Sequence, residues 1–139
     1  MLIVFGGLPG TGKTTVSREV AARRAATYLR IDAIEQAIRD AGVLAGEVGT
    51  AGYHVADVLA EANLAGGRAV VVDCVNPVAE SRMAWQALAV RASVRLVEIE
   101  VICSDPVEHR RRVEGRGSDI LGLIPPTWQE VVDLSLIHI

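Results

Sequence analysis

Short apolar runs recur along this sequence and alternate with longer segments of mixed polarity. The runs cover Leu2 to Phe5, Tyr28 to Ile31, Arg68 to Asp73 and Val94 to Cys103. Each has the length of a strand, and a near-continuous β-branched run such as the third is typical of a parallel strand buried on both faces. The alternation with helical segments predicts one α/β domain, with a parallel sheet between two layers of helices.

The first three helices are predicted from apolar spacing and from the residues that stop them. We expect one from Lys13 to Ala26, with Val16 and Val20 one turn apart on its buried side. We expect a second from Ala33 to Ala41 and a third from Thr50 to Ala65, each followed by glycine. In the third helix the apolar residues at helical spacing are Val55, Val58, Leu59 and Ala62.

The later helices are predicted from capping residues. Asn76-Pro77 is typical of an N-cap followed by proline at the first helical position, and it opens a helix through Val90. Asp105-Pro106 with Glu108 repeats the cap signature after the fourth strand. Thr127-Trp128-Gln129-Glu130 forms a capping box that opens a last short helix.

The stretch between the first strand and the first helix carries the clearest chemistry. It reads Gly7-Leu8-Pro9-Gly10-Thr11-Gly12-Lys13-Thr14-Thr15. Two glycines separated by four residues and followed by lysine and a hydroxyl residue form the phosphate-loop pattern. Such a loop aims backbone N–H groups at an anion, and the N-terminus of the following helix adds its positive dipole. The stretch is therefore predicted to bind a nucleoside triphosphate rather than to be a glycine-rich turn without a ligand.

Two residues of this stretch have assigned roles. Lys13 is expected to reach the outer phosphates, and the Thr14 hydroxyl is expected to hold a Mg²⁺ that bridges them. Lys13 is the only lysine in the chain, whereas the other thirteen basic residues are arginines. The compact ammonium group therefore stands where it fits beside phosphates.

Length and composition narrow the class of partner. A chain of 139 residues, half of them hydrophobic, suits one domain. A formal charge of −3 and an aromatic content of 4% disfavour an extended nucleic-acid surface, so a small-molecule partner is favoured. No apolar run approaches the ~18 residues of a membrane span, and we expect a cytoplasmic protein. Cys74 and Cys103 are expected to be buried thiols without a metal or disulfide role.

Two carboxylates are expected at the ends of strands. Asp32 follows the second strand and Asp73 ends the third. Ligands of open α/β sheets bind at this edge, so Asp32 could accept the proton of an acceptor hydroxyl and Asp73 could steady Mg²⁺. Each residue also has a local interpretation, because Asp32 with Glu35 resembles a capping box and Asp73 could be a simple strand-end carboxylate. The cap and base roles of Asp32 can coexist, since a cap uses only one carboxylate oxygen.

Arginines supply candidate substrate and lid contacts. Arg82 lies in the fourth predicted helix and could reach substrate, although a solvated arginine fits equally well. Arginines at positions 110, 111, 112 and 116 gather after the last strand, where a solvated face is the usual interpretation. One or two of them folding over a transferring phosphoryl group would stabilise its charge. We take Arg112 and Arg116 as the candidates.

The end of the sequence departs from the strand-and-helix pattern. After Asp133 the chain continues as Leu134-Ser135-Leu136-Ile137-His138-Ile139, which contains no turn. Back-translated, these six residues match a common sequencing-library adapter. We therefore expect a domain over residues 1–133 and a non-native tail over 134–139, and we assign His138 no role.

Four motifs together resemble a known family. They are GLPGTGKTT after an apolar strand, Ile31-Asp32 after the second strand, VVVDCVNP with the downstream Arg82, and RRRVEGRG followed by PPTWQEVV. In this order they resemble AAA-type P-loop kinases related to polynucleotide kinase, zeta toxins and chloramphenicol phosphotransferase. The resemblance covers about residues 1 to 133. It implies a P-loop NTPase fold, a three-layer α/β/α sandwich with a mostly parallel sheet ordered 2-3-1-4-5, and the sequence ends before the fifth strand.

The same resemblance implies ATP as phosphoryl donor, Asp32 as the group that activates the acceptor hydroxyl, and a lid formed by the segment from Arg112 to Arg116. In that sheet order the strands that carry Cys74 and Cys103 flank the first strand. Two strand spacings of ~4.8 Å would separate them, which is too far for a disulfide.

These observations favour a kinase that moves the γ-phosphate of ATP to a hydroxyl of a small molecule. The expected catalytic residues are Lys13, Asp32, Arg112 and Arg116; Thr14 and Asp73 would hold Mg²⁺, and Asp32 and Arg82 would contact the acceptor. An NTP-hydrolysing ATPase is an alternative, although Cys74 follows Asp73 where an AAA-type hydrolase has glutamate. A nucleotide-binding module without catalysis and a polynucleotide 5′-hydroxyl kinase are the others.

Overall fold

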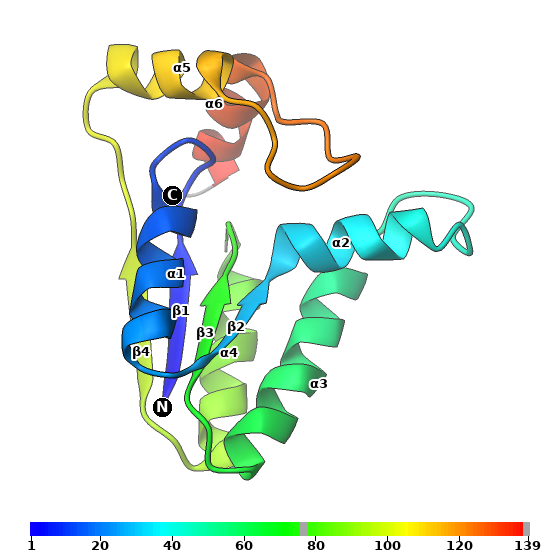
Figure 1. The fold of residues 1–139 in the computed structure, drawn as a ribbon, viewed down its shortest axis with the longest axis vertical. Coiled ribbons are helices and arrows are strands. Elements are labelled where there is room, and N and C mark those ends of the chain that lie inside the picture. Colours follow the sequence, from blue (N-terminus) through cyan, green and yellow to red (C-terminus); the bar gives the residue numbers. More distant parts are fainter. Residues whose placement is uncertain (76–77, 138–139) are drawn as a thin grey trace.

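A four-stranded sheet forms the centre of the protein in a computed structural model, which describes residues 1–75 and 78–137. The strands are β1 (Leu2–Gly6), β2 (Thr27–Arg30), β3 (Val70–Asp73) and β4 (Leu96–Glu100). Every pairing is parallel, and the order is β2-β3-β1-β4 (Figure 1). The predicted parallel sheet is confirmed, and its described strands follow the order that the family resemblance implies.

Helices cover both faces of this sheet. Helix α1 (Lys13–Arg23) lies on one face, and α3 (Ala51–Ala65) and α4 (Ala79–Ala92) lie on the other (Figure 1). Helix α2 (Ile31–Asp40) continues directly from β2 and contacts α3. The last two helices, α5 (Pro106–Gly115) and α6 (Trp128–Ile137), lie beyond the carboxyl ends of the strands. The architecture is an α/β/α sandwich with two further helices over the carboxyl edge of its sheet.

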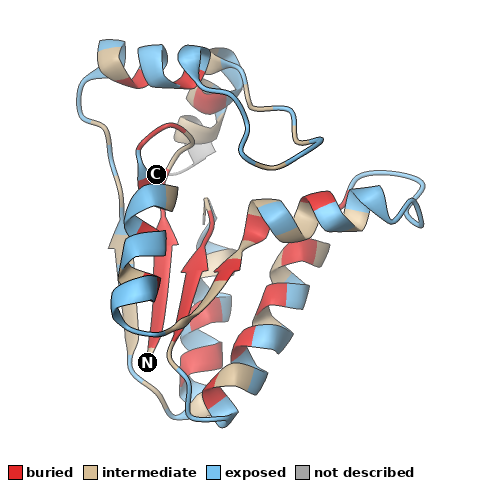
Figure 2. Ribbon diagram, in the orientation of Figure 1, coloured by how far each residue is buried: buried red, intermediate tan, exposed pale blue. Residues whose placement is uncertain are grey.

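Two apolar cores hold these layers together, because alternate side chains of a strand point to opposite faces. Leu2 and Val4 pack with Trp85 on the side of α3 and α4, whereas Ile3 and Phe5 pack on the side of α1. All residues of β1 and β3 are buried, as Figure 2 shows. Each fully buried apolar side chain stabilises the fold by roughly 1.5–3 kcal/mol. Truncation of Trp85 to alanine is expected to cost about 3–5 kcal/mol.

Two helices bury faces that differ from the predicted ones. Val16 is 44% exposed, so its predicted burial is wrong, and α1 instead buries Ser17 and Ala21. In α3 the predicted apolar positions are largely exposed, with Val58 at 67%. The residues that α3 buries are Gly52, Ala56, Ala60 and Leu64. Small residues face the sheet and α2 because the backbones approach closely: a Cβ on Gly52 would lie 2.6 Å from Glu35 Cγ.

Helix boundaries also correct the predictions around Asp32. Strand β2 ends at Arg30 and α2 begins at Ile31, so Asp32 lies inside the first turn of α2 rather than after a strand. Arg30 is the N-cap residue and no side chain caps the helix, so the predicted cap at Asp32 is wrong. Helix α1 ends at Arg23, three residues early, because Ala25 has a φ of +48° that a helix cannot continue through.

The capping predictions for the last two helices are confirmed. Asp105 Oδ1 accepts hydrogen bonds from the N–H groups of Val107 and Glu108 at 3.0 and 3.4 Å. Thr127 and Glu130 bond reciprocally at 3.3 and 3.2 Å, as a capping box requires. The predicted cap at Asn76-Pro77 and His138 lie outside the described residues. None of the helices in the described ranges is long and apolar enough to cross a membrane.

Candidate functional site

The phosphate loop joins β1 to α1, and its glycines are required by the backbone. Gly7, Gly10 and Gly12 have φ angles of +142°, +80° and +91°, which L side chains rarely adopt. A Cβ on Gly7 would lie 2.4 Å from the Val101 carbonyl oxygen, and one on Gly10 would lie 2.6 Å from Val113 Cγ2. The loop therefore packs closely against the chain after β4 and against α5.

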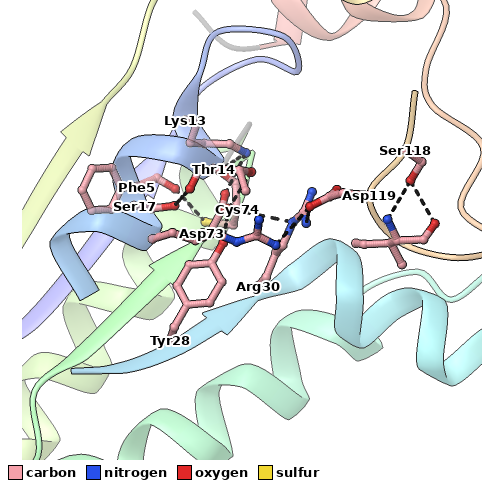
Figure 3. Close-up of polar contacts among 12 residues, drawn as sticks. Phe5, Lys13, Thr14, Ser17, Tyr28, Arg30, Asp73, Cys74, Ser118 and Asp119 are labelled. Atoms are coloured by element: carbon pink, nitrogen blue, oxygen red, sulfur yellow. Dashed lines mark hydrogen bonds and ion pairs between the residues drawn. The ribbon is translucent and has the colours of Figure 1, made fainter. Parts of the chain in front are cut away.

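Lys13 opens α1 and turns its ammonium group toward the end of β3. Lys13 Nζ donates to the Cys74 carbonyl oxygen at 3.0 Å and lies 3.3 Å from Asp73 Oδ1 (Figure 3). The side chain is only 10% exposed. A charge so far removed from water needs a close counter-charge, and Asp73 supplies it.

Asp73 receives two further hydrogen bonds. Thr14 Oγ1 donates to Asp73 Oδ2 at 2.8 Å, and the Tyr28 hydroxyl donates to the same oxygen at 2.7 Å (Figure 3). Burial by itself would raise the pKa of Asp73, but the charge of Lys13 and the hydrogen bonds from Tyr28 and Thr14 outweigh it and lower that pKa. The carboxylate is therefore held in its ionised form. Burial, assisted by Asp73, raises the pKa of Tyr28 to about 12.

Thr14 and Asp73 fit the chemistry of a Mg²⁺ site. They present a hydroxyl and an ionised carboxylate to one another at 2.8 Å, beside the phosphate loop. Mg²⁺ prefers hard oxygen ligands and is usually held by one or two protein groups together with substrate phosphates. This pair could hold the ion in that way.

A cavity of about 460 Å³ lies above the phosphate loop, between α2 and the segment that follows α5. A volume of this size suits a small molecule. Its charged lining residues are Lys13, Arg30, Asp32, Glu35, Arg39 and Arg116. Its apolar wall includes Leu8, Val75, Leu123, Ile124, Pro126 and Leu134. Burial and the charge of Asp32 raise the pKa of Glu35.

The structure brings most of the predicted site residues to this cavity. Those that line it are Leu8, Pro9, Gly10, Gly12, Lys13, Thr14, Thr15, Asp32 and Arg116. Arg112 instead faces a neighbouring hollow beside Gly10 and Gly12, and its Nε donates to Glu108 at 3.0 Å. Arg82 is half-buried on α4 and does not line the cavity. The candidate lid and acceptor arginines therefore do not all converge.

Two residues that contact the site were not predicted from the sequence. Arg30 lines the cavity from the last position of β2, and its place at a strand's carboxyl end was an available signal. His109 is 7% exposed and its Nε2 lies 2.8 Å from the Pro9 carbonyl oxygen. Because it stands among charged residues of α5, no sequence pattern marks His109 as buried.

The match to a protein family agrees with this geometry. A family model described as an AAA domain matches residues 2–120. The chain belongs to this AAA domain family. The match covers the phosphate loop, Asp32, Asp73 and the whole described sheet. The sheet and the phosphate loop therefore both lie in the part of the chain that matches this family.

Curated relatives of the domain share only a short segment. Uncharacterized proteins of Mycobacterium tuberculosis and Mycobacterium bovis are 44% identical to it over 48 residues, which is 34% of this chain and 10% of each relative. The matched segment is about a tenth of the length of these relatives.

Solved structures share the fold over nearly the whole chain. Kti12 of Chaetomium thermophilum, in complex with ADP-AlF3, has a TM-score of 0.77 at 20% identity, over 99% of this chain and 80% of its own. A Chloroflexus aurantiacus protein proposed to be a kinase has a TM-score of 0.72 at 22% identity, over 99% and 74%. A gluconokinase from Sinorhizobium meliloti has a TM-score of 0.59 at 20% identity, over 95% and 73%. The AAA domain thus has the α/β fold of P-loop kinases.

Proposed function

We propose that this AAA domain is a kinase that transfers the γ-phosphoryl group of Mg²⁺·ATP to a hydroxyl group of a small molecule. The observation that carries the proposal is that the phosphate loop and the Asp32 carboxylate line the same cavity. The kinases among the structural neighbours support it at the level of fold. A phosphate grip and a proton acceptor in one cavity are what phosphoryl transfer to a hydroxyl needs.

The donor half of the site consists of the loop and the end of β3. Loop N–H groups and Lys13 would hold the β- and γ-phosphates, and Thr14 with Asp73 would hold Mg²⁺. When bound, the ion neutralises charge on the transferring phosphoryl group. Tyr28 and Lys13 keep Asp73 ionised and oriented, so Thr14 and Asp73 are arranged before nucleotide arrives.

The acceptor half consists of the residues that α2 brings to the cavity. The acceptor hydroxyl oxygen forms a bond to the γ-phosphorus while the bond from that phosphorus to the β–γ bridging oxygen breaks and ADP leaves. The hydroxyl proton passes to the Asp32 carboxylate. Asp32 lies in the first turn of α2, where its backbone is fixed by the helix. Arg82 would act only if the acceptor extends beyond the cavity.

Arg116 is the better placed of the two candidate lid residues. It lines both the main cavity and the hollow beside Gly10 and Gly12, whereas Arg112 lines only the latter. A guanidinium group at that position would stabilise negative charge on the phosphoryl oxygens as transfer proceeds. Arg112 would join it after leaving Glu108.

An acceptor screen with labelled ATP tests the proposal. Purified protein is incubated with Mg²⁺·ATP and hydroxyl compounds that include sugars, nucleosides, antibiotics and 5′-hydroxyl oligonucleotides. We expect label to move to one class of small molecule, and we expect Lys13→Ala to abolish both nucleotide binding and transfer. Phosphate release that no acceptor changes would replace the kinase by a hydrolase. Unchanged ATP affinity in Lys13→Ala would remove the donor site, and label on the oligonucleotides alone would identify a polynucleotide kinase.

A further inference from the structure

Arg30 is a cation in the wall of the cavity whose side chain has little exposed surface. It is the last residue of β2, its side chain is 9% exposed, and it lines the cavity together with Asp32. A guanidinium group with so little water around it requires an anionic partner at hydrogen-bonding distance. The identity of that partner decides what Arg30 is available to do.

Asp73 is not that partner at close range. Arg30 Nε lies 3.9 Å from Asp73 Oδ2, which already accepts hydrogen bonds from Thr14 and Tyr28, while the other carboxylate oxygen faces Lys13. The hydrogen-bonding capacity of Asp73 is committed to the donor half of the site. Arg30 therefore depends on a different carboxylate.

Asp119 supplies the missing carboxylate from a distant part of the chain. Arg30 Nη1 donates to Asp119 Oδ2 at 2.8 Å (Figure 3). Arg18 Nη2 donates to the same oxygen at 3.0 Å. Although burial alone would lower the pKa of Arg30, Asp119 and Asp73 raise it. The hydrogen bond from Arg30 lowers the pKa of Asp119 to about 2. The pair is thus fully charged at neutral pH.

Asp119 is nevertheless easy to replace. It lies in the loop between α5 and α6, and its side chain is 48% exposed. Water and salt therefore reach Asp119 and compete for its side of the ion pair, whereas Arg30 needs an anion at this position whichever molecule supplies it. A carboxylate or phosphate group of a small molecule entering the cavity can take the place of Asp119 on Arg30 at little cost.

The other cations of the cavity lie close to the phosphate loop or to a carboxylate on their own helix. Lys13 and Arg116 face the phosphate loop, and Arg39 Nη2 lies 3.6 Å from Glu35 Oε2 on the same helix. Arg30 is the cavity cation whose strongest partner comes from a loop. An arginine fork also matches the geometry of carboxylate and phosphate oxygens better than an ammonium does.

We infer that the acceptor of this kinase is a hydroxy compound with an acidic group, that Arg30 binds this group, and that Asp119 occupies its place when the acceptor is absent. That this acidic compound is the phosphoryl acceptor rests on the proposed function, whereas the binding of an acid to Arg30 does not. With the acid on Arg30 and Asp32 in the same cavity, the acceptor is held at one end and its hydroxyl is directed to the proton acceptor.

Binding to nucleotide-loaded protein tests the inference. The phosphate loop is first filled with Mg²⁺ and a non-hydrolysable ATP analogue, and D-glycerate, glycerol 3-phosphate and glycerol are then titrated by calorimetry. We expect both acids to bind at least tenfold more tightly than glycerol. Arg30→Gln should reduce this preference by about 10- to 100-fold, the range for a charge-assisted hydrogen bond. Asp119→Asn should tighten acid binding several-fold without changing glycerol binding.

A matched control lies at the far end of α1 from the cavity. Arg23 is an exposed arginine paired with Glu19, and Arg23→Gln should leave all three affinities unchanged. Equal binding of glycerol and the acids, no acid binding at millimolar concentration, or weaker acid binding in Asp119→Asn would overturn the inference. Asp119→Asn is on an exposed loop, so it carries the test if Arg30→Gln does not fold.

The inference and the proposed function fail separately. If the acids bind through Arg30 but no hydroxyl compound is labelled by ATP, the kinase proposal fails and the acid site stands. If neutral hydroxyl compounds are labelled and the acids neither bind nor accept label, the kinase stands and the acid site fails.

Discussion

His109 Nε2 donates a 2.8 Å hydrogen bond to the Pro9 carbonyl oxygen and thereby joins helix α5 to the phosphate loop. The carbonyl oxygen can only accept, so the ring proton is on Nε2. The ring of Trp128 packs edge-on against the imidazole, with the two ring centroids 5.1 Å apart, so α6 joins the same contact. The conformation of the loop is therefore coupled to the position of the two helices above it.

Removal of this contact should weaken nucleotide binding. In His109→Ala the Pro9 carbonyl loses its partner and a buried cavity opens, so we expect a destabilisation of about 1–3 kcal/mol. We also expect a several-fold loss of ATP affinity in a calorimetric titration. His54→Ala, at an exposed position on α3, is the control. An affinity that stays at the wild-type value would show that the loop holds its shape without α5.

Gly10→Ala should disturb the same junction from the other side. The alanine backbone would have to adopt a φ of +80°, and its methyl group would lie 2.6 Å from Val113 Cγ2. The backbone strain alone costs roughly 1–2 kcal/mol. Thermal unfolding should show a lower midpoint than in Gly46→Ala, because a Cβ at Gly46 meets open space. Equal midpoints would contradict the close packing of loop and α5.

Asp32→Asn should separate proton transfer from nucleotide binding. The amide keeps the size of the side chain but cannot accept the hydroxyl proton, so transfer should fall by about 10²- to 10⁴-fold. The Kd for ATP should remain near the wild-type value. Asp40→Asn, on the exposed end of the same helix, should transfer phosphate normally. Full transfer by Asp32→Asn would assign the base role to another group.

Thr14→Val should remove the metal dependence of ATP binding. The substitution keeps the branched shape but deletes the hydroxyl that donates to Asp73. Wild-type protein should bind ATP more tightly with Mg²⁺ than with excess chelator, and the variant should bind equally under both conditions. Thr127→Val, outside the cavity, should retain the metal dependence. A metal effect that survives in Thr14→Val would place the ion on other groups.

We expect the free energy of unfolding to decrease at alkaline pH, because two groups hold their protons more tightly in the native state than in the unfolded chain. Burial raises the pKa of Cys74 to about 12 from 9.0, and that of Tyr28 to about 12 from 10.0. At a pH between its ordinary pKa and its raised pKa, each group keeps a proton in the native state that it has released in the unfolded chain. The free energy of unfolding therefore falls as pH rises from 9 to 12. Below pH 9 both groups contribute fully. Urea unfolding from pH 7 to 11 should show this slope, and Tyr28→Phe should make it shallower; a flat profile would refute the assignment.

Local patterns sufficed for the sheet and the phosphate loop. Each apolar run specifies its own strand, and the loop glycines and Lys13 stand in consecutive positions. The buried face of α1 could not be predicted in this way. Ser17 is buried and Val16 is exposed, and the burial of Ser17 leaves no unpaired hydroxyl because it donates to the Thr14 carbonyl oxygen at 3.1 Å. Hydrophobicity alone ranks these two residues in the opposite order.

The acidic contact of Arg30 was beyond any local pattern. Arg30 and Asp119 are 89 positions apart, and neither has a neighbour in sequence that marks the pair. Asp32 lies at the predicted carboxyl edge of the sheet, although the helix begins one residue before it rather than after it. Strand-end reasoning therefore located the cavity but could not say which charges meet inside it.

The single lysine of this chain has a practical consequence. Lys13 carries the one side-chain amine in these 139 residues. Because Lys13 Nζ donates to the Cys74 carbonyl oxygen and faces Asp73, acylating reagents should reach it slowly in the folded protein. A mass increment on the peptide that contains Lys13 then reports how accessible its ammonium group is. The accessibility of the site can therefore be followed in the native protein by mass spectrometry, without an engineered probe.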